Sequence, residues 1–167
     1  VYLMNEAECE LMIAEAYARL GNAEKAEEYY NKGVLAGFSR WGFDGTAFVD
    51  GAYKFDKADM LHSIAMQYWV TYAGANAYDG WRTRNRLGIP EVQANITVRK
   101  STTALQRELS DGYVLGNLVD PGASNMNAGE YPMRLLYPTA TTLYNSAAEM
   151  YVESNGNSLT KTVLWEK

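Results

Sequence analysis

The sequence has only one cysteine and one histidine among its 167 residues, and each scarcity excludes a class of site. A lone cysteine, Cys9, cannot form an intrachain disulfide, and we expect it to be buried in a helix as a small hydrophobic residue. Metal centres built from clustered Cys and His ligands are excluded by the same count. His62 has no local motif around it and receives no functional role.

The sequence also lacks a long apolar segment and an excess of positive charge. No apolar run approaches the ~20 residues that a membrane-spanning helix requires, and the first residues lack the pattern of a signal peptide. The net charge of −5 argues against general binding to nucleic acid or anionic lipid. Because the chain opens on Val1 within helical sequence, we expect it to be a portion of a longer protein.

Aromatic side chains are abundant, with 13 Tyr, 4 Trp and 4 Phe. Hydrophobic residues make up 47% of the chain, which is typical of a globular protein. Tyrosine at this level is common at contact surfaces, because its ring is rigid and its hydroxyl forms hydrogen bonds. A tyrosine-rich core is an equally good interpretation for any single residue.

Residues 1–36 are predicted to form an antiparallel helical hairpin. Residues 3–20 carry an apolar stripe at helical spacing, Gly21 ends that helix, and Asn22 caps a second helix over 23–36. Glu15 and Arg19 form a favourable i,i+4 pair. The hairpin resembles one tetratricopeptide repeat, with no second copy in the residues that follow. The stripe is Met4, Ala7, Leu11, Ala14 and Ala18; the repeat positions are Ala14, Tyr17, Gly21, Ala26, Tyr30 and Gly33.

Residues 37–56 are predicted to be an irregular aromatic loop, because four glycines interrupt any periodicity. Aromatic rings stack on the apolar faces of sugars while polar neighbours bond the hydroxyls, and this loop contains both kinds of residue. We select Trp41, Phe43 and Tyr53 as candidate ligand-binding residues, and core packing is the alternative for each. Their polar neighbours are Arg40, Asp44 and Asp50.

Residues 57–90 are predicted to be mainly one long helix that Gly74 or Gly80 ends or bends, with helix-stop signals at Gly88 and Pro90. Its apolar stripe is Leu61, Ile64, Tyr68, Tyr72 and Ala75. Residues 91–137 form a loop-rich insert. Residues 138–167 form a last helix, with Pro138 as its first residue, and a tail. The fold class is therefore all-α: a tetratricopeptide-like hairpin packed with further helices and long irregular loops.

No group of residues predicts catalysis. There is no G-x-S-x-G motif, no partner for a catalytic His, and no carboxylate pair that the sequence singles out for glycoside hydrolysis. The Asp-Gly steps at 44–45 and 50–51 lack the spacing of a calcium loop and are interpreted as turns. Arg82, Arg84 and Arg86 could bind an anion, but capping the end of a helix is the favoured role. We predict no enzyme activity, no catalytic residue, no metal and no cofactor.

Four segments carry a resemblance to a known family. The first is LMIAEAYARLGNAEKA in the hairpin, and the last is TKTVLWEK, with Leu164 and Glu166 where the family has Trp and Asp. Between them, residues 67–92 match a Q-x-W segment and a helix ending in arginines, and residues 131–145 match a Pro-x-Arg…Tyr-Pro…Asn pattern. The matched positions are Gln67, Trp69, Trp81, Arg84, Arg86, Gly88, Pro90, Pro132, Arg134, Tyr137, Pro138 and Asn145. In this order the segments resemble the C-terminal part of the SusD/RagB family.

The chain departs from the family pattern at two places. Ala140 and Thr141 stand where an acidic residue usually follows Tyr-Pro, and Asn85 interrupts a pair of arginines. These differences indicate a divergent branch, and no ligand contact is transferred from the family.

The resemblance implies a mainly helical, non-catalytic nutrient-binding subunit that works with a SusC-like TonB-dependent transporter. It implies an oligosaccharide ligand, or a peptide in some branches, and no nucleic acid. It also implies a cell-surface place at the outer membrane, with a lipid anchor on an N-terminal segment absent from this chain. The N-terminal remainder of the same protein would be a further partner.

A cytosolic tetratricopeptide-like scaffold for protein–protein interaction is the alternative function. It explains residues 1–36 equally well. It does not explain the matching segments at 67–92 and 131–145.

Overall fold

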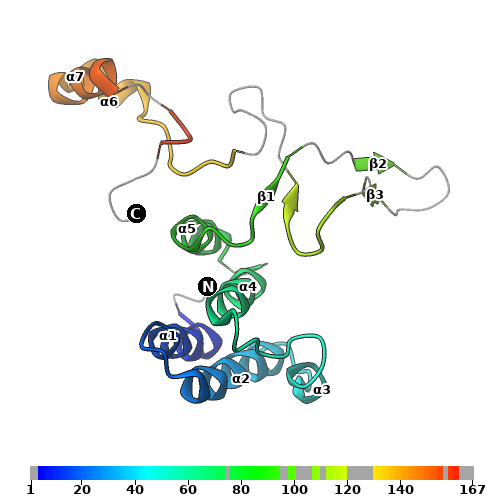
Figure 1. The fold of residues 1–167 in the computed structure, drawn as a ribbon. Coiled ribbons are helices and arrows are strands. Elements are labelled where there is room, and N and C mark those ends of the chain that lie inside the picture. Colours follow the sequence, from blue (N-terminus) through cyan, green and yellow to red (C-terminus); the bar gives the residue numbers. More distant parts are fainter. Residues whose placement is uncertain are drawn as a thin grey trace. The chain divides into compact units, whose positions relative to one another are not determined.

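The computed structural model of the protein describes residues 4–73, 76–94, 98–100, 107–109, 112–119, 130–155 and 158–161. These residues belong to two compact units, Val1–Pro90 and Glu91–Lys167. Helices make up most of the described chain, and its strands are two or three residues long (Figure 1). The predicted all-α class is confirmed.

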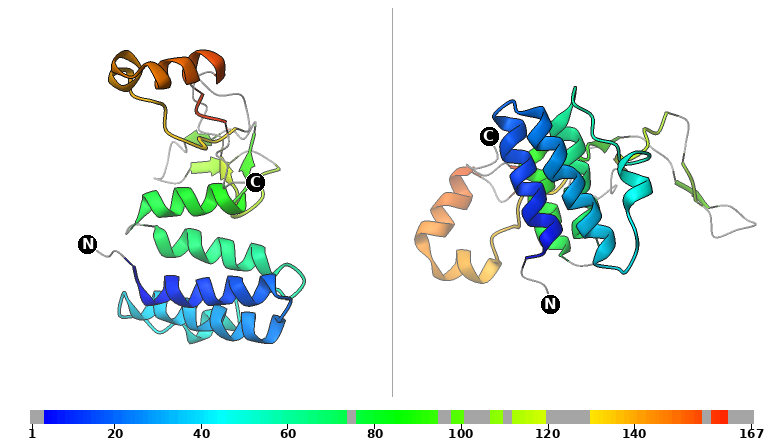
Figure 2. Two further views of the ribbon diagram at one scale, coloured as in Figure 1. Left: turned by 90° about the vertical axis from the view of Figure 1, so that its left-hand side faces the viewer. Right: turned by 90° about the horizontal axis from the view of Figure 1, so that it is seen from below.

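The first unit is a stack of antiparallel helices. Helix α1 packs along α2 and against α4, and α4 packs against α5. The left view of Figure 2 shows α1, α4 and α5 lying one above another. The helices are α1 (Glu6–Arg19), α2 (Ala23–Ser39), α3 (Thr46–Val49), α4 (Met60–Tyr72) and α5 (Ala77–Leu87).

The turn between α1 and α2 forms at the residues that the sequence indicated. Gly21 adopts the left-handed conformation, with a φ of 75°. Its N–H donates to the Ala18 carbonyl and the Asn22 N–H donates to the Tyr17 carbonyl, both at 3.0 Å, which is the Schellman arrangement for ending a helix. The Asn22 side chain then accepts the Lys25 N–H at 3.1 Å and starts α2.

Gly33 allows α1 and α2 to approach closely. A Cβ atom added to Gly33 would lie 2.9 Å from Cγ of Leu11 and 3.3 Å from the Ala7 carbonyl oxygen. Those distances are shorter than ordinary van der Waals contacts, and Leu11 is fully buried and has little room to move. The small residue is therefore required by helix packing.

We expect Gly33→Ala to lower the free energy of unfolding by about 1 kcal/mol, because overpacking outweighs the better helix propensity of alanine. Gly37→Ala in the same helix is the matched control. Its added Cβ would lie 4.0 Å from Ala7 and Thr71, so it should raise the free energy of unfolding by about 0.5 kcal/mol. Urea unfolding measures both variants. Equal effects of the two substitutions would contradict the close packing at Gly33.

The long helix predicted over 57–90 is two helices, because α4 ends at Tyr72, shortly before Gly74, and α5 begins at Ala77. Ala73 has a ψ of 128°, outside the helical region, and the Asn76 side chain donates to Asp79 at the start of α5. Gly74 and Ala75 lie outside the described residues.

Gly80 has a different role from the expected bend. It lies inside α5, where an added Cβ would be 2.9 Å from Cβ of Tyr72 on α4. The glycine therefore permits α5 to pack closely on α4, and periodicity alone did not reveal this tertiary contact.

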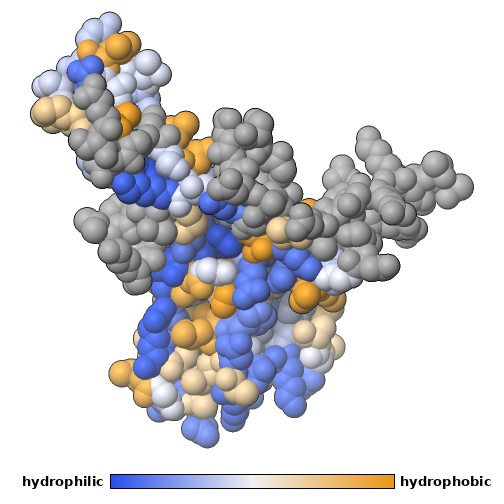
Figure 3. All heavy atoms as spheres, turned by 45° about the horizontal axis from the view of Figure 1, so that its top comes forward, coloured by the Kyte–Doolittle hydropathy of each residue, from blue (hydrophilic) through white to orange (hydrophobic). Residues whose placement is uncertain are grey.

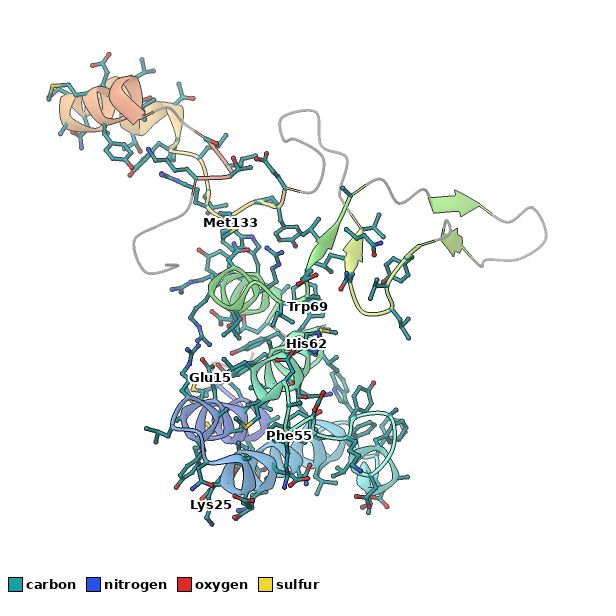
Figure 4. The ribbon with its side chains drawn as sticks, in the orientation of Figure 1. Glu15, Lys25, Phe55, His62, Trp69 and Met133 are labelled. Atoms are coloured by element: carbon teal, nitrogen blue, oxygen red, sulfur yellow. The ribbon has the colours of Figure 1, made fainter. Side chains whose placement is uncertain are left out.

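The core of the first unit comes from α1, α2, α4 and one loop residue. Phe55 is buried against Tyr30, with ring centroids 5.0 Å apart, and it joins the loop after α3 to the helices (Figure 4). The buried members are Leu11, Ala14, Ala18, Ala26, Tyr30, Val34, Phe55, Ile64, Tyr68 and Tyr72. Most of the predicted apolar stripes are thus buried.

Two expectations for α1 are wrong. Met4 lies before the helix and is 56% exposed. Cys9 is exposed because it lies two residues before the buried Leu11, and residues two apart point to different sides of a helix.

The described residues of the second unit form short strands and two helices. Strand β1 pairs with β4 in parallel, with Val92 opposite Leu118, and β2 pairs with β3 in antiparallel fashion. The elements are β1 (Val92–Gln93), β2 (Val98–Lys100), β3 (Arg107–Leu109), β4 (Leu118–Val119), α6 (Thr139–Tyr144) and α7 (Ser146–Asn155).

The predicted last helix is two helices. Pro138 is the residue that precedes α6, and Asn145 adopts an extended conformation between α6 and α7. The Asn145 side chain accepts the Ala147 N–H at 3.1 Å, which starts α7. Residues 162–167 of the tail lie outside the described residues.

Candidate ligand-binding site

A cavity with a volume of about 190 Å³ lies between the end of α2, the residues that follow it, and the second half of α4. It is smaller than the ~300–1,000 Å³ typical of pockets for drug-sized ligands, so it suits a single sugar ring or one amino-acid side chain. Its lining is Val34, Gly37, Phe38, Arg40, Trp41, Phe43, Gln67, Val70 and Thr71.

Trp41 and Phe43 both line this cavity and are exposed residues, at 61% and 68%. A tight turn holds them there. The N–H groups of Trp41 and Phe43 both donate to the Phe38 carbonyl, at 3.0 and 3.1 Å. Gly42 between them has a φ of 77°, which favours glycine. The turn thus holds the backbone of two aromatic residues that the core does not bury.

Arg40 adds a positive charge beside the exposed indole. Its guanidinium carbon lies 5.1 Å from the centroid of the Trp41 ring, which is the geometry of a cation–π contact. Arg40 is the one charged residue among the described residues that line the cavity. The site therefore combines an aromatic surface with several hydrogen-bond donors.

Tyr53 is not among the lining residues. Its ring packs near Phe38 and Phe48, with centroid distances of 6.3 and 5.7 Å. Its backbone carbonyl accepts a hydrogen bond of 2.8 Å from the hydroxyl of Tyr30. The structure therefore brings Trp41 and Phe43 together at the cavity. The Tyr53 ring packs against other aromatic rings outside the cavity lining.

The sequence interpretation missed the contribution of α4 to the cavity. Gln67 is 6% exposed, lines the cavity, and hydrogen-bonds the Tyr30 hydroxyl. Burial raises the pKa of Tyr30 to about 12, and the bond from Gln67 opposes part of that rise. A polar residue on the buried face of the helix was the available signal, since Gln67 lies between Ile64 and Tyr68 of the predicted apolar stripe.

Exposed hydrophobic residues are not confined to this cavity. Figure 3 shows hydrophobic and hydrophilic side chains interspersed on the visible face of the helical unit. Exposure of a single aromatic ring therefore does not by itself indicate a binding site. The candidate site depends on the combination of a cavity, two exposed aromatic residues and a guanidinium group.

Comparison with known protein families gives one match that covers most of the chain. A SusD-like family model, described as "Starch-binding associating with outer membrane", matches residues 1–109. The chain belongs to the SusD-like family. It is thus part of a family of carbohydrate-binding proteins associated with the outer membrane, and members of this family bind without catalysing a reaction. No curated protein matches the sequence.

The SusD-like match includes the segment at 67–92 and ends before the segment at 131–145. In the described part of the chain, no helix is long and apolar enough to cross a membrane. Among the same residues, no group of three or more His, Cys, Asp or Glu side chains is placed to hold a metal ion.

Two of the arginines at the end of α5, Arg84 and Arg86, hold the scaffold. Arg84 is buried and its Nε donates to the Pro90 carbonyl at 2.9 Å, closing the turn after α5. Gly88 has a φ of 72°, and its N–H donates to the Arg84 carbonyl at 2.7 Å. The predicted role of Arg84 as a cap of the helix end is wrong, because its side chain bonds the Pro90 carbonyl, which lies beyond the end of α5.

Arg86 reaches α1 across α4. Its Nη1 and Nη2 donate to Oε1 and Oε2 of Glu15, at 2.5 and 2.8 Å, and Glu15 also accepts from Arg19. Burial would raise the pKa of Glu15, but the bonds from Arg86 and Arg19 outweigh it and leave that pKa below its ordinary value. Arg86 is therefore a tertiary clamp, a role that its position in the sequence did not indicate.

Two tyrosines of α4 lie in the same interior with different hydrogen bonding. The Tyr72 hydroxyl donates to Oε1 of the buried Glu8 at 2.7 Å. The Tyr68 hydroxyl is buried without a hydrogen-bond partner among the described residues. Burial raises the pKa of both hydroxyl groups, so both are neutral at physiological pH.

Proposed function

We propose that the chain is the C-terminal portion of a SusD/RagB-like, non-catalytic nutrient-binding subunit that works with a SusC-like TonB-dependent transporter. Family membership is the observation that carries this proposal. The subunit would be held at the cell surface by a lipid anchor on an earlier segment of the same protein. Reading the start of the gene for a signal peptide and a lipidation cysteine tests the anchor. Co-purification of the full protein with the transporter encoded beside it tests the partnership.

An oligosaccharide is the proposed ligand, and the cavity at the end of α2 is its proposed site. Trp41 and Phe43 offer exposed ring faces to the apolar face of a sugar, while Arg40 and Thr71 offer donors to its hydroxyl groups. The small volume fits one sugar ring. The predicted role of Tyr53 becomes a supporting one, through its backbone carbonyl and Tyr30.

We expect Trp41→Ala to weaken the binding of a malto-oligosaccharide at least tenfold, because the largest ring at the cavity is removed. Tenfold corresponds to about 1.4 kcal/mol of binding free energy. Calorimetry is the appropriate measurement, since the substitution also removes a fluorescent indole. Trp41→Phe keeps a stacking ring and should retain most of the affinity.

Tyr144→Ala is the matched control for that experiment, because Tyr144 is also a highly exposed aromatic residue, at 89%. It lies on α6, outside the cavity, and its loss should leave binding unchanged. Unchanged affinity in Trp41→Ala would remove this residue from the site. A silent glycan panel together with a responding peptide panel would replace the sugar by a peptide.

A peptide is the second candidate ligand, and the apolar part of the cavity lining favours it. Val34, Phe38 and Val70 would contact a hydrophobic side chain as readily as a sugar face. The tetratricopeptide-like scaffold remains an alternative for the hairpin alone, and a cytosolic start of the gene, with no transporter gene beside it, would favour that function.

A further inference from the structure

A second cavity lies beside the candidate site, between the beginning of α1 and the end of α2. Its volume is about 360 Å³. The lining differs from that of the first cavity, because it mixes polar residues with Met and Ala and no aromatic ring is among its described members. These are Met4, Asn5, Glu6, Ala7, Ala36, Ser39 and Arg40.

The two cavities share the last turns of α2. Ala36 and Ser39 line the second cavity, whereas Val34 and Gly37 line the first. Residues three or four apart lie on one face of a helix, so the two pairs occupy adjacent faces. Arg40 lines both cavities and therefore stands on the boundary between them.

Gly37 lies between the two cavities and has no side chain that would separate them further. The position of its missing Cβ lies 4.0 Å from Cβ of Ala7, which lines the second cavity. It also lies 4.0 Å from Oγ1 of Thr71, which lines the first. With no side chain at this position, the two cavities flank a single glycine.

The polar groups of the second cavity suit sugar hydroxyls. Glu6 supplies a carboxylate that accepts hydrogen bonds, Arg40 supplies several donors, and the Ser39 hydroxyl does both. The Asn5 side-chain oxygen already accepts the Glu8 N–H at 2.9 Å, so it serves mainly to cap α1. The negative charge of Glu6 in the same cavity opposes an anionic ligand, and a neutral sugar is the better fit.

We propose that this second cavity is a sugar subsite, which is occupied by the next unit of a neutral oligosaccharide whose first unit is bound at the first cavity. One unit stacks on Trp41 and Phe43, and the next reaches Glu6 and Ser39 across Gly37. Arg40 donates to both units. This inference rests on the proposed sugar binding at the first cavity.

Calorimetry of the full chain with methyl α-glucoside and methyl α-maltoside tests the second subsite. These one-unit and two-unit probes suit a family described as starch-binding. We expect the maltoside to bind at least tenfold more tightly than the glucoside. Glu6→Gln should weaken maltoside binding about tenfold and leave glucoside binding unchanged. Arg40→Gln should weaken both.

Glu24→Gln is the matched control, because Glu24 occupies the first turn of α2 as Glu6 occupies the first turn of α1. It should alter neither affinity. Equal affinity of the wild-type chain for the two probes, or equal losses in Glu6→Gln, would overturn the second subsite and leave the proposed function standing. Binding of neither probe would overturn sugar binding at the first cavity as well.

Discussion

Replacing Arg86 by glutamine is expected to lower the free energy of unfolding by about 2 to 3 kcal/mol. The substitution leaves the Glu15 carboxylate in place but removes its bidentate partner. The Glu15 side chain is only 9% exposed, and removing one member of a buried pair typically costs about 3–5 kcal/mol. The Arg86 side chain is 39% exposed, so we expect a value below that range. Chemical denaturation with circular dichroism measures the change.

Arg19→Gln is the control for the clamp, because Arg19 also pairs with Glu15 but has a side chain 52% exposed. An exposed pair of this kind contributes at most about 1 kcal/mol. Similar losses in the two variants would contradict the assignment of Arg86 as the tertiary clamp between α1 and α5.

Acid should reduce the difference between the wild-type chain and Arg86→Gln. The folded-state pKa of Glu15 is lowered, so its ionised form stabilises the fold fully above the ordinary Glu pKa of about 4.3. That stabilisation disappears as the pH falls through the lower folded-state pKa. A difference in stability that stayed constant below pH ~4 would show that packing of Arg86, and not its charge, carries the effect.

The paired substitutions Tyr72→Phe and Tyr68→Phe are expected to change stability in opposite directions. Tyr72→Phe should lower the free energy of unfolding by about 2 kcal/mol, because the buried Glu8 carboxylate loses its hydrogen-bond donor. The other oxygen of that carboxylate, Oε2, is already buried without a partner among the described residues. The loss would therefore leave both oxygens of Glu8 unsatisfied.

Tyr68→Phe should raise the free energy of unfolding by about 1 kcal/mol, because it removes a buried hydroxyl that has no partner among the described residues. The two tyrosines lie one turn apart on α4 with stacked rings, 6.0 Å between centroids, so each variant controls for the other. Thermal unfolding ranks the three proteins. A destabilised Tyr68→Phe would show that its hydroxyl has a bound partner, such as an ordered water molecule.

Local signals in the sequence were sufficient for the hairpin and insufficient for the helices that follow it. Gly21 and Asn22 act through backbone conformation and short-range hydrogen bonds, which neighbouring residues decide. The helix predicted over 57–90 divides after Tyr72, where the backbone leaves the helical conformation. The apolar spacing of the sequence continues through this break and does not reveal it. Periodicity predicts which face of a helix is buried. It does not predict that α4 and α5 pack on each other at Gly80.

The candidate site was predictable in part. An irregular stretch rich in aromatic residues pointed to Trp41 and Phe43, and the cavity brings them together. Tyr53 lies in the same stretch, but its ring packs against the core. The sequence could not show this difference, because no local rule separates a ring that covers the core from one that faces solvent. Gln67 and Thr71 reach the cavity from α4, so their contribution depends on how α4 packs against α2.

The helical class, the turn at Gly21, most of the core stripes and the resemblance to SusD-like proteins could all be inferred from residue order. They depend on interactions between residues that are close together in the chain. The contact between Arg86 and Glu15, the helix spacings at Gly33 and Gly80, and the two cavities at the end of α2 could be found only in the folded structure. Each of these depends on residues far apart in the chain that come into contact only when the helices pack.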